Sequence, residues 1–161
     1  MPDLNNQKKV VWISNSLSKQ LVHQWRSEEQ VILVGTNTIL KDNPQLTCRL
    51  KKNRGRHPAR IILDRRNRIP LTAKVFANSK TQRVVYVSGS KLSTKREKLL
   101  AAKNIEVLKV KTLKSGFDLK QLMKLLAEKE LNSILIEGGG EINSSALEAG
   151  VVDRVFAFIS P

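Results

Sequence analysis

The sequence predicts a three-layer α/β protein in which helices cover both faces of a mainly parallel sheet. Short apolar runs recur along the chain, and each is typical of a strand that is buried on both faces. Segments with apolar residues at helical spacing separate these runs, and this alternation implies right-handed crossovers between parallel strands. The expected strands occupy residues 10–13, 31–34, 59–63, 84–87, 105–110, 134–136 and 151–159.

Polar capping residues and helix breakers mark where the expected helices begin and end. A short helix over 38–40 ends at Asn43, which precedes Pro44, and a helix over 92–103 ends at Asn104, which suits a left-handed stop. Asp118 and Gln121 have the spacing of a capping box at the start of a further helix. The candidate caps of the first two helices are Ser14, Asn15 or Ser16, and then Thr36 or Asn37.

The composition is that of a soluble globular domain with a hydrophobic core. The chain has 161 residues, of which 40% are hydrophobic and 27% charged. No apolar run approaches the ~20 residues that cross a bilayer, and the polar residues 1–9 do not form the apolar segment of a signal peptide. We therefore expect a cytoplasmic protein with a disordered or linking segment over 1–9 and one domain over 10–161.

The formal net charge of +15 indicates an anionic partner. The basic residues are spread from Lys8 to Arg154, most of them before Lys129, rather than gathered in one tract, and the chain has only seven aromatic residues. Basic chains commonly bind nucleic acid, membranes or phosphorylated metabolites, and the charge alone does not choose among them. We keep two hypotheses: an enzyme with phosphorylated ligands, and a non-catalytic basic α/β module that binds RNA or a nucleotide. Single-strand binders need aromatic stacking platforms, so the scarcity of aromatic residues favours the enzyme.

Glu137 and the glycines Gly138–Gly140 stand between an expected strand and an expected helix. This arrangement places unpaired backbone N–H groups and the positive end of the helix dipole around one point, which suits an anion. A Cβ at the turn would keep a pyrophosphate away from the backbone. The glycines do not form the G-x-G-x-x-G fingerprint, and a plain tight turn accounts for them equally well.

Polar or glycine-containing loops follow several of the expected strands. Because ligands of parallel sheets bind beyond the carboxyl ends of the strands, these loops predict a nucleotide-binding crevice at one edge of the sheet. The loops are residues 35–38, 64–66, 88–91 and 137–140. We expect a cluster from two of these loops to contact the adenosine 2′-phosphate of a cofactor there: Arg65, Arg66, Ser88, Ser90 and Lys91.

Several stretches together resemble the reductase domain of the bifunctional riboflavin-biosynthesis deaminase–reductases. The stretches are WIS at 12–14, VHQWR at 22–26, VGTNT at 34–38, DNPQLTCR at 42–49, PARIILD at 58–64, LIEGG at 135–139 and LEAGVVD at 147–153. The resemblance implies a dihydrofolate-reductase-like fold and a homodimer. It also implies that NADPH reduces the ribosyl chain of 5-amino-6-(5-phosphoribosylamino)uracil to a ribityl chain.

The resemblance further implies the residues of the site. The substrate would be held by Arg26, Leu46, Arg49 and Glu137, and Glu137 would be the catalytic residue. The cofactor would be held by Trp12, Thr38, Asp42, Gly139, Gly140, Glu141, Ile142, Asn143, Ser144 and Ser145. The two arginines offer planar forks that match a sugar phosphate. Simpler roles stay open for three residues: Arg26 as a solvated helix end, Trp12 as a core residue and Asp42 as the start of a turn.

The chain departs from the family pattern at several positions. Cys48 is its single cysteine, so it can form neither an internal disulfide nor the P-C-x-x-C zinc site of the deaminase half, and we expect no metal. The deaminase domain is therefore expected elsewhere, on the same or another chain. Val10 and Arg65 stand where the family has serines. The family's domain begins upstream of residue 10 and continues beyond Pro161, so we expect a domain truncated at both ends.

Overall fold

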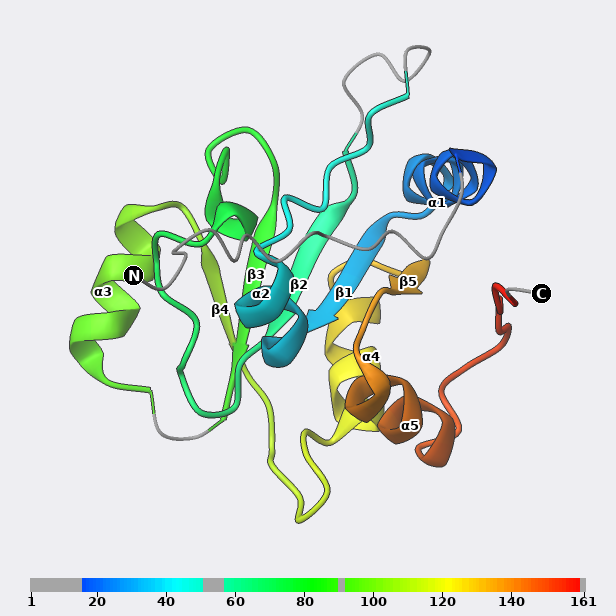
Figure 1. The fold of residues 1–161 in the computed structure, drawn as a ribbon. Coiled ribbons are helices and arrows are strands. Elements are labelled where there is room, and N and C mark those ends of the chain that lie inside the picture. The colour runs from blue at the N-terminus through cyan, green and yellow to red at the C-terminus, as the bar shows by residue number, and fades with distance from the viewer. Residues whose placement is uncertain (1–15, 51–56, 90–91, 160–161) are drawn as a thin grey trace, which may run out of the picture.

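The computed structural model of the chain describes residues 16–50, 57–89 and 92–159. In this part of the chain one sheet has the strand order β4-β3-β2-β1-β5, and every pairing is parallel (Figure 1). The strands are β1 (Val31–Gly35), β2 (Ala59–Leu63), β3 (Val84–Ser88), β4 (Glu106–Lys109) and β5 (Ile134–Ile136). The expected α/β class with a parallel sheet is confirmed.

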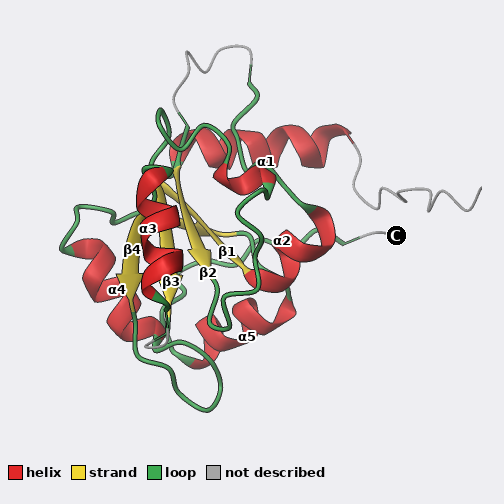
Figure 2. Cartoon of the chain, turned by 90° about the vertical axis from the view of Figure 1, so that its left-hand side faces the viewer, coloured by secondary structure: helices red, strands yellow, loops and turns green. Residues whose placement is uncertain are grey.

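Helices cover both faces of this sheet. Figure 2 shows the strands between α4 on one side and α2 on the other, and Figure 1 shows α1 near the β5 edge. The helices are α1 (Ser16–Glu28), α2 (Thr36–Asp42), α3 (Thr94–Ala102), α4 (Leu119–Ala127) and α5 (Gly140–Glu148), with a 3₁₀ turn, η1, over Lys74–Phe76. Among the described residues no helix is long and apolar enough to cross a membrane.

Alternate residues of the central strands build two separate hydrophobic clusters. Leu33, Ile61 and Val85 face one side of the sheet, where residues of α4 and α5 pack on them. Ile32 and Ile62 face the other side, together with residues of α2, η1 and α3. Successive side chains of a strand point to opposite faces, so a strand covered on both faces becomes an uninterrupted apolar run. This is why β1, β2 and β3 were recognisable from sequence.

Two expectations about local structure are wrong. Residues 151–159 form no strand: Val151 and Val152 pack against the core, while Phe156 stacks on Trp25 with ring centroids 4.2 Å apart. In the described part of the chain this segment lies on α1 rather than pairing with a sheet edge. Neither Thr36 nor Asn37 caps α2, whose N-cap is Gly35 without a side-chain bond. The expected strand over 10–13 lies outside the described residues.

The predicted helix stops and one predicted cap are present. Asn104 follows α3 with φ of 57°, and Asn43 ends α2 with φ of 42°. Asp118 caps α4 by accepting a hydrogen bond from the backbone N–H of Gln121 at 3.0 Å. The Gln121 side chain does not complete a capping box, because its Oε1 accepts from the backbone N–H of Lys111 at 2.8 Å.

Arg60 is a charged residue in the middle of the sheet. Its side chain on β2 is 1% exposed, and its guanidinium donates to the carbonyl oxygens of Gln45 at 3.2 Å and Ala77 at 2.7 Å. Burial lowers the pKa of Arg60 to about 10, which leaves it a cation at neutral pH. Arg60 therefore ties the loop after α2 and the segment after η1 to the sheet.

We expect Arg60→Met to destabilise the protein although it removes a buried charge. The substitution leaves the carbonyls of Gln45 and Ala77 without their charged donor. Both hydrogen bonds are partly buried, and a hydrogen bond to a charged group contributes about 1.5–3 kcal/mol, against a partial gain from not burying the cation. We expect a net loss of roughly 1–3 kcal/mol in urea unfolding. Arg83→Met is the control, because that side chain is 43% exposed and its ion pair contributes about 0–1 kcal/mol. An unchanged midpoint for Arg60→Met would contradict the role.

Candidate functional site

A cavity of about 600 Å³ opens at the carboxyl ends of the strands (the carboxyl edge of the sheet). Its walls come from the loops after β1 and β2, from the start of α5 and from the segment before α4. Three of the predicted loops meet here, represented by Thr38, Arg65 and Gly139. In the fourth loop, Ser88 is fully buried and lies outside the lining, and residues 90 and 91 are not described. The predicted crevice is therefore present, with Ser88 excluded from its surface.

The glycine turn presents open backbone to this cavity. Gly139 is the N-cap of α5 and makes no side-chain capping bond, and both Gly139 and Gly140 are exposed. A Cβ at Gly140 would meet nothing within 4 Å, and one at Gly139 would lie 3.5 Å from Thr38 Oγ1. The exposed backbone and the positive end of α5 together favour an anionic group at this point.

Gly138 has a different role from the two glycines that follow it. A Cβ at Gly138 would lie 2.8 Å from Ile142 Cβ, and one at Gly35 would lie 2.7 Å from Ile142 Cγ1. Both glycines therefore allow Ile142 to pack α5 closely against the ends of β1 and β5. Ile142 lines the cavity, and its close packing positions the turn.

The loop after β2, residues 65–69 (the arginine loop), brings cations to the same cavity. Arg65, Arg66 and Arg68 all line it. Arg68 Nη2 donates to Asn37 Oδ1 at 2.9 Å, and Asn37 Nδ2 donates to Glu141 Oε2 at 3.1 Å. These two hydrogen bonds connect the arginine loop to the first turn of α5. The arginines supply positive charge beside the open backbone of the glycine turn.

Asp64, at the carboxyl end of β2, holds the arginine loop. It is fully buried and accepts hydrogen bonds from the backbone N–H groups of Arg68 at 3.0 Å and Ile69 at 2.8 Å. The hydroxyls of Tyr86 and Thr36 donate to it at 2.8 and 3.2 Å. Burial and the charge of Asp64 raise the pKa of Tyr86, which keeps its hydroxyl a donor. The sequence placed Asp64 in the loop 64–66 at the end of a predicted strand and gave it no role of its own, although it follows a buried strand as Glu137 does.

Glu137 and Arg26 form a second polar cluster next to the glycine turn. Arg26 Nε donates to Glu137 Oε1 at 2.6 Å and Nη2 to Oε2 at 2.5 Å, with side chains 12% and 20% exposed. Arg26 Nη1 also donates to the carbonyl of Thr47 at 3.2 Å. Arg26 is therefore not the solvated helix end that was the simpler alternative. Both residues were expected to contact a substrate separately, and the structure joins them in a bidentate pair.

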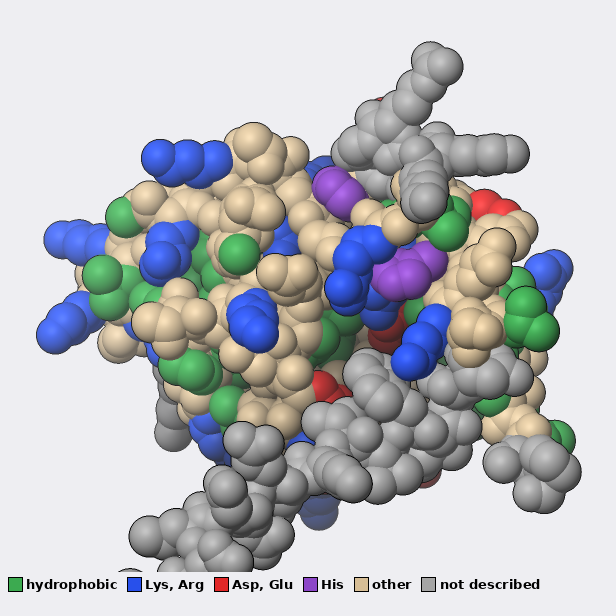
Figure 3. Space-filling model, turned by 45° about the horizontal axis from the view of Figure 1, so that its top comes forward, with side chains coloured by type: hydrophobic (Ala, Val, Ile, Leu, Met, Phe, Trp, Pro, Cys, Tyr) green, Lys and Arg blue, Asp and Glu red, His purple; other side chains and the backbone are tan. Residues whose placement is uncertain are grey.

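Further basic groups surround this pair. Burial lowers the pKa of His23, and the positive charges of Arg26 and Arg49 lower it further. Figure 3 shows lysine and arginine side chains gathered around the histidines on this face. Cys48 is buried, and its Sγ contacts the carbonyl oxygen of His23 at 3.3 Å. Sequence reasoning gave His23 no role, because a single histidine on a helix carries no signal.

The other predicted residues divide between cavity, core and surface. Thr38, Arg65, Gly139, Gly140, Glu141, Ile142 and Ser145 line the cavity. Asn143, Ser144 and Asp42 are exposed and outside the lining, and Asp42 is the last residue of α2. Leu46 is 3% exposed in a hydrophobic cluster, with φ of 52°. Trp12 and Lys91 lie outside the described residues.

One wall of the cavity was not predicted from sequence. Ser115, Gly116, Phe117 and Leu119 line it. A bridge between Thr112 and Phe117 and the mutual backbone hydrogen bonds of Leu113 and Gly116 close this turn. The dipeptide Ser115-Gly116 is a turn signal, but no local pattern shows that the turn folds against the β2 loop.

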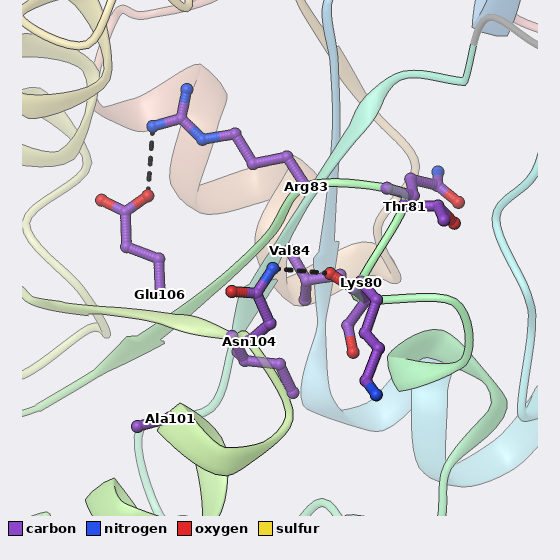
Figure 4. A pocket seen from close by; sticks show the side chains of 10 residues that line it. Lys80, Thr81, Arg83, Val84, Ala101, Asn104 and Glu106 are labelled. Carbon is purple, nitrogen blue, oxygen red and sulfur yellow. Dashed lines mark hydrogen bonds and ion pairs between the residues drawn. The ribbon is translucent and has the colours of Figure 1, made fainter.

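A second hollow, of about 550 Å³, lies at the opposite edge of the sheet (Figure 4). It stands at the amino ends of β3 and β4, where Arg83 Nη2 pairs with Glu106 Oε2 at 3.1 Å and Asn104 Nδ2 donates to the carbonyl of Ser79 at 3.3 Å. It has neither a glycine turn nor a helix N-terminus aimed at it. Because parallel sheets bind ligands at their carboxyl ends, the first cavity is the candidate site.

Comparisons with known proteins match this architecture. The chain matches the RibD C-terminal domain family over residues 5–161. It is 38% identical to the riboflavin biosynthesis protein RibD of Aquifex aeolicus over 93% of this chain and 40% of that protein. It is 29% identical to the 2,5-diamino-6-ribosylamino-4(3H)-pyrimidinone 5′-phosphate reductase of Archaeoglobus fulgidus, over 96% of this chain and 72% of that protein.

A solved structure agrees with these sequence matches. The diaminohydroxyphosphoribosylaminopyrimidine deaminase/5-amino-6-(5-phosphoribosylamino)uracil reductase of Thermotoga maritima superposes with a TM-score of 0.65 at 33% identity, over 85% of this chain and 35% of that one. The expected dihydrofolate-reductase-like α/β fold is thereby confirmed. The chain spans about 40% of the length of the RibD relatives that it matches.

The environment of His23 predicts a pH dependence of stability. Its pKa in the folded protein is lowered from 6.5, so the unfolded chain takes up the proton first and stability falls as pH drops through and below about 6.5. We expect His23→Gln to lose less stability than the unchanged protein between about pH 7.5 and 5.5, measured by urea unfolding at both values. His57→Gln, at an exposed position, is the control. An equal loss in His23→Gln and the unchanged protein would contradict the prediction.

Proposed function

Because the chain belongs to the RibD C-terminal domain family, we propose that it is an NADPH-dependent oxidoreductase of riboflavin biosynthesis. It reduces the ribosyl chain of 5-amino-6-(5-phosphoribosylamino)uracil to the ribityl product. Family membership confirms the resemblance seen in the sequence. The observation that carries the proposal is the juxtaposition of an open helix N-terminus, three cavity-lining arginines (Arg65, Arg66, Arg68) and the adjacent Arg26–Glu137 pair.

The cavity residues fit a phosphorylated dinucleotide. The exposed backbone at Gly139 and Gly140 leaves room for a pyrophosphate at the N-terminus of α5. Arg65 and Arg66 line the same cavity from the loop after β2, where charge-assisted hydrogen bonds suit the additional phosphate of NADPH. When bound, NADPH supplies the hydride, so the protein needs no nucleophile and contributes binding and orientation.

Arg26 and Glu137 fit a polar, phosphorylated substrate. A guanidinium has five N–H donors, and Glu137 and Thr47 occupy only some of those of Arg26. The remaining donors of Arg26 and the exposed Arg49 bind the substrate phosphate. The carboxylate of Glu137 keeps unused lone pairs, with which it accepts hydrogen bonds from the substrate and favours its open-chain imine form. Glu137 therefore both fixes Arg26 and orients the substrate.

The proposal includes two properties that accompany this activity in the family it resembles. We propose that the protein is a homodimer and acts in the cytoplasm, where its substrate is a soluble phosphorylated pyrimidine. The deaminase step then belongs to a domain on the same or another chain. Sedimentation velocity over a range of protein concentrations tests the dimer, and a single monomeric species at every concentration would contradict it.

The first test is a titration with NADPH, followed by an assay of NADPH oxidation with the pyrimidine substrate. Trp25, which stacks on Phe156, and Trp12 provide intrinsic fluorescence for the titration. We expect saturable NADPH binding and substrate-dependent oxidation. The nucleic-acid hypothesis would replace the reductase hypothesis if two results came together. The protein would bind RNA with an affinity that falls ~10³–10⁵-fold between 50 and 200 mM salt, and it would show no response to NADPH.

The two substrate residues should give separate kinetic signatures. Arg49→Ala removes a phosphate contact, so we expect it mainly to raise the substrate KM, by roughly tenfold for one charge-assisted hydrogen bond. Glu137→Gln should lower kcat, while the NADPH dissociation constant measured by fluorescence stays nearly unchanged. Glu106→Gln is the control, since Glu106 pairs with Arg83 and Lys129 at the opposite edge of the sheet. Full kcat in Glu137→Gln would remove Glu137 from the mechanism.

The arginine loop should determine the choice between NADPH and NADH. Arg65→Ala and Arg66→Ala each remove a cation from the cavity wall. We expect each substitution to lower the ratio of the NADH dissociation constant to the NADPH dissociation constant by roughly tenfold, mainly because NADPH binding becomes weaker. Arg83→Ala, at the opposite edge, serves as control. If neither variant changes the ratio, the loop does not contact the 2′-phosphate.

A further inference from the structure

Four hydrogen-bond donors converge on the buried carboxylate of Asp64. Oδ1 accepts from the backbone N–H of Arg68 and from Thr36 Oγ1, and Oδ2 accepts from the backbone N–H of Ile69 and from the Tyr86 hydroxyl. Arg96 Nη2 lies 3.8 Å from Oδ2 and partly balances the charge. Burying a carboxylate is costly unless hydrogen bonds and a counter-charge compensate it. Here Oδ2 accepts two hydrogen bonds, and Oδ1 accepts one from the Arg68 N–H and shares the single hydrogen of Thr36 Oγ1 with the carbonyl of Leu63.

Most of these donors belong to segments that line the candidate cavity. Arg68 and Ile69 are the last two residues of the arginine loop, and Thr36 is the first residue of α2. Arg68 and Thr36 themselves contribute to the cavity wall. The carboxylate therefore connects two sides of the cavity to the end of β2. Tyr86 and Arg96, from β3 and α3, hold it from the opposite side.

The arginine loop depends on this carboxylate for its return to the sheet. Asn67 has a left-handed backbone, with φ of 55°, and its N–H donates to the Asp64 carbonyl at 3.3 Å. The chain then turns back so that two consecutive N–H groups, of Arg68 and Ile69, meet the carboxylate. A side chain that holds both N–H groups fixes the backbone of the loop from which Arg65 and Arg66 project, and Arg65 Nη1 also donates to the Leu113 carbonyl at 3.4 Å.

We propose that Asp64 is a positioning residue that sets the preference of this protein for a phosphorylated nicotinamide cofactor. This inference rests on the proposed function. Asp64 contacts no ligand and acts through the arginine loop. A guanidinium discriminates a phosphate monoester from a hydroxyl only when its donors are aimed at the phosphate oxygens. Asp64 keeps Arg65 and Arg66 in that orientation, so its loss weakens NADPH binding more than NADH binding.

Asp64→Asn is the informative substitution because it preserves shape. An amide nitrogen cannot accept a hydrogen bond, so the two donors that meet one carboxylate oxygen lose their acceptor. We expect the ratio of NADH to NADPH dissociation constants to fall roughly tenfold, toward that of Arg66→Ala, while the KM for the pyrimidine substrate stays within about twofold. The dissociation constants come from tryptophan fluorescence and do not depend on turnover.

The combined variant Asp64→Asn, Arg66→Ala distinguishes positioning from a general structural role. If Asp64 acts through the loop, Asp64→Asn lowers the ratio less in the Arg66→Ala background than in the unchanged protein, since only Arg65 is left for Asp64 to orient. A merely structural Asp64 would give additive effects. Glu106→Gln is the matched control, being a half-buried carboxylate with two cationic partners, and it should leave the ratio unchanged.

The binding measurements separate failure of this inference from failure of the proposed function. An unchanged ratio in Asp64→Asn, or additive effects in the combined variant, overturns the inference and leaves the proposed function intact. If the unchanged protein binds neither nucleotide, the proposed function fails first. If Asp64→Asn does not fold, Tyr86→Phe removes a single donor and keeps the carboxylate. It should shift the ratio in the same direction by about two- to threefold for one neutral hydrogen bond, and an unchanged ratio there overturns the inference.

Discussion

The candidate site depends on two opposite charges buried on one strand. Arg60 lies within β2 and Asp64 directly follows it, so the two residues are four apart on the same face of the sheet. Arg60 donates to backbone carbonyls of the loop after α2, and Asp64 accepts from backbone N–H groups of the loop after β2. Each charge satisfies main-chain groups through hydrogen bonds that are partly or fully buried, and in doing so fixes the segments that carry them.

A similar arrangement holds the other half of the site. Glu137 directly follows β5, as Asp64 follows β2, and its partner Arg26 comes from the last turn of α1. Both acids therefore end a strand at the carboxyl edge and orient arginines there, Glu137 through its side-chain pair and Asp64 through the backbone. The difference is exposure: the Asp64 side chain is 0% exposed and that of Glu137 is 20%. Only Glu137 can meet a ligand directly, which matches a positioning role for Asp64 and a binding role for Glu137.

The sequence predicted what depends on local periodicity. The strands β1, β2 and β3 are continuous apolar runs because helices cover both of their faces, and the stops at Asn43 and Asn104 follow from their left-handed backbones. The sheet-edge crevice and the open turn at Gly139 followed from the rule for parallel sheets. Features that depend on distant contacts were not predictable. Thr36 has the residue type of a cap, but its hydroxyl points to the end of β2, where Leu63 O lies at 2.8 Å and Asp64 Oδ1 at 3.2 Å. Leu46 and Ser88 were predicted to contact a ligand, Leu46 from the family resemblance and Ser88 from its place in a loop after a strand, but both side chains are buried in the interior.

The net charge of +15 and the oriented arginines perform different tasks. Charges spread over a surface attract any anion at long range, and salt screens that attraction beyond about 10 Å at 0.1 M ionic strength. Discrimination between phosphorylated ligands requires guanidinium groups in fixed directions at short range, where screening is weak. In the described part of the chain, such fixed arginines stand at the carboxyl edge, each tied to a carboxylate or to backbone held by one. Under the proposed function, Asp64 and Glu137 therefore convert an unspecific positive charge into a site with a directional preference for phosphate.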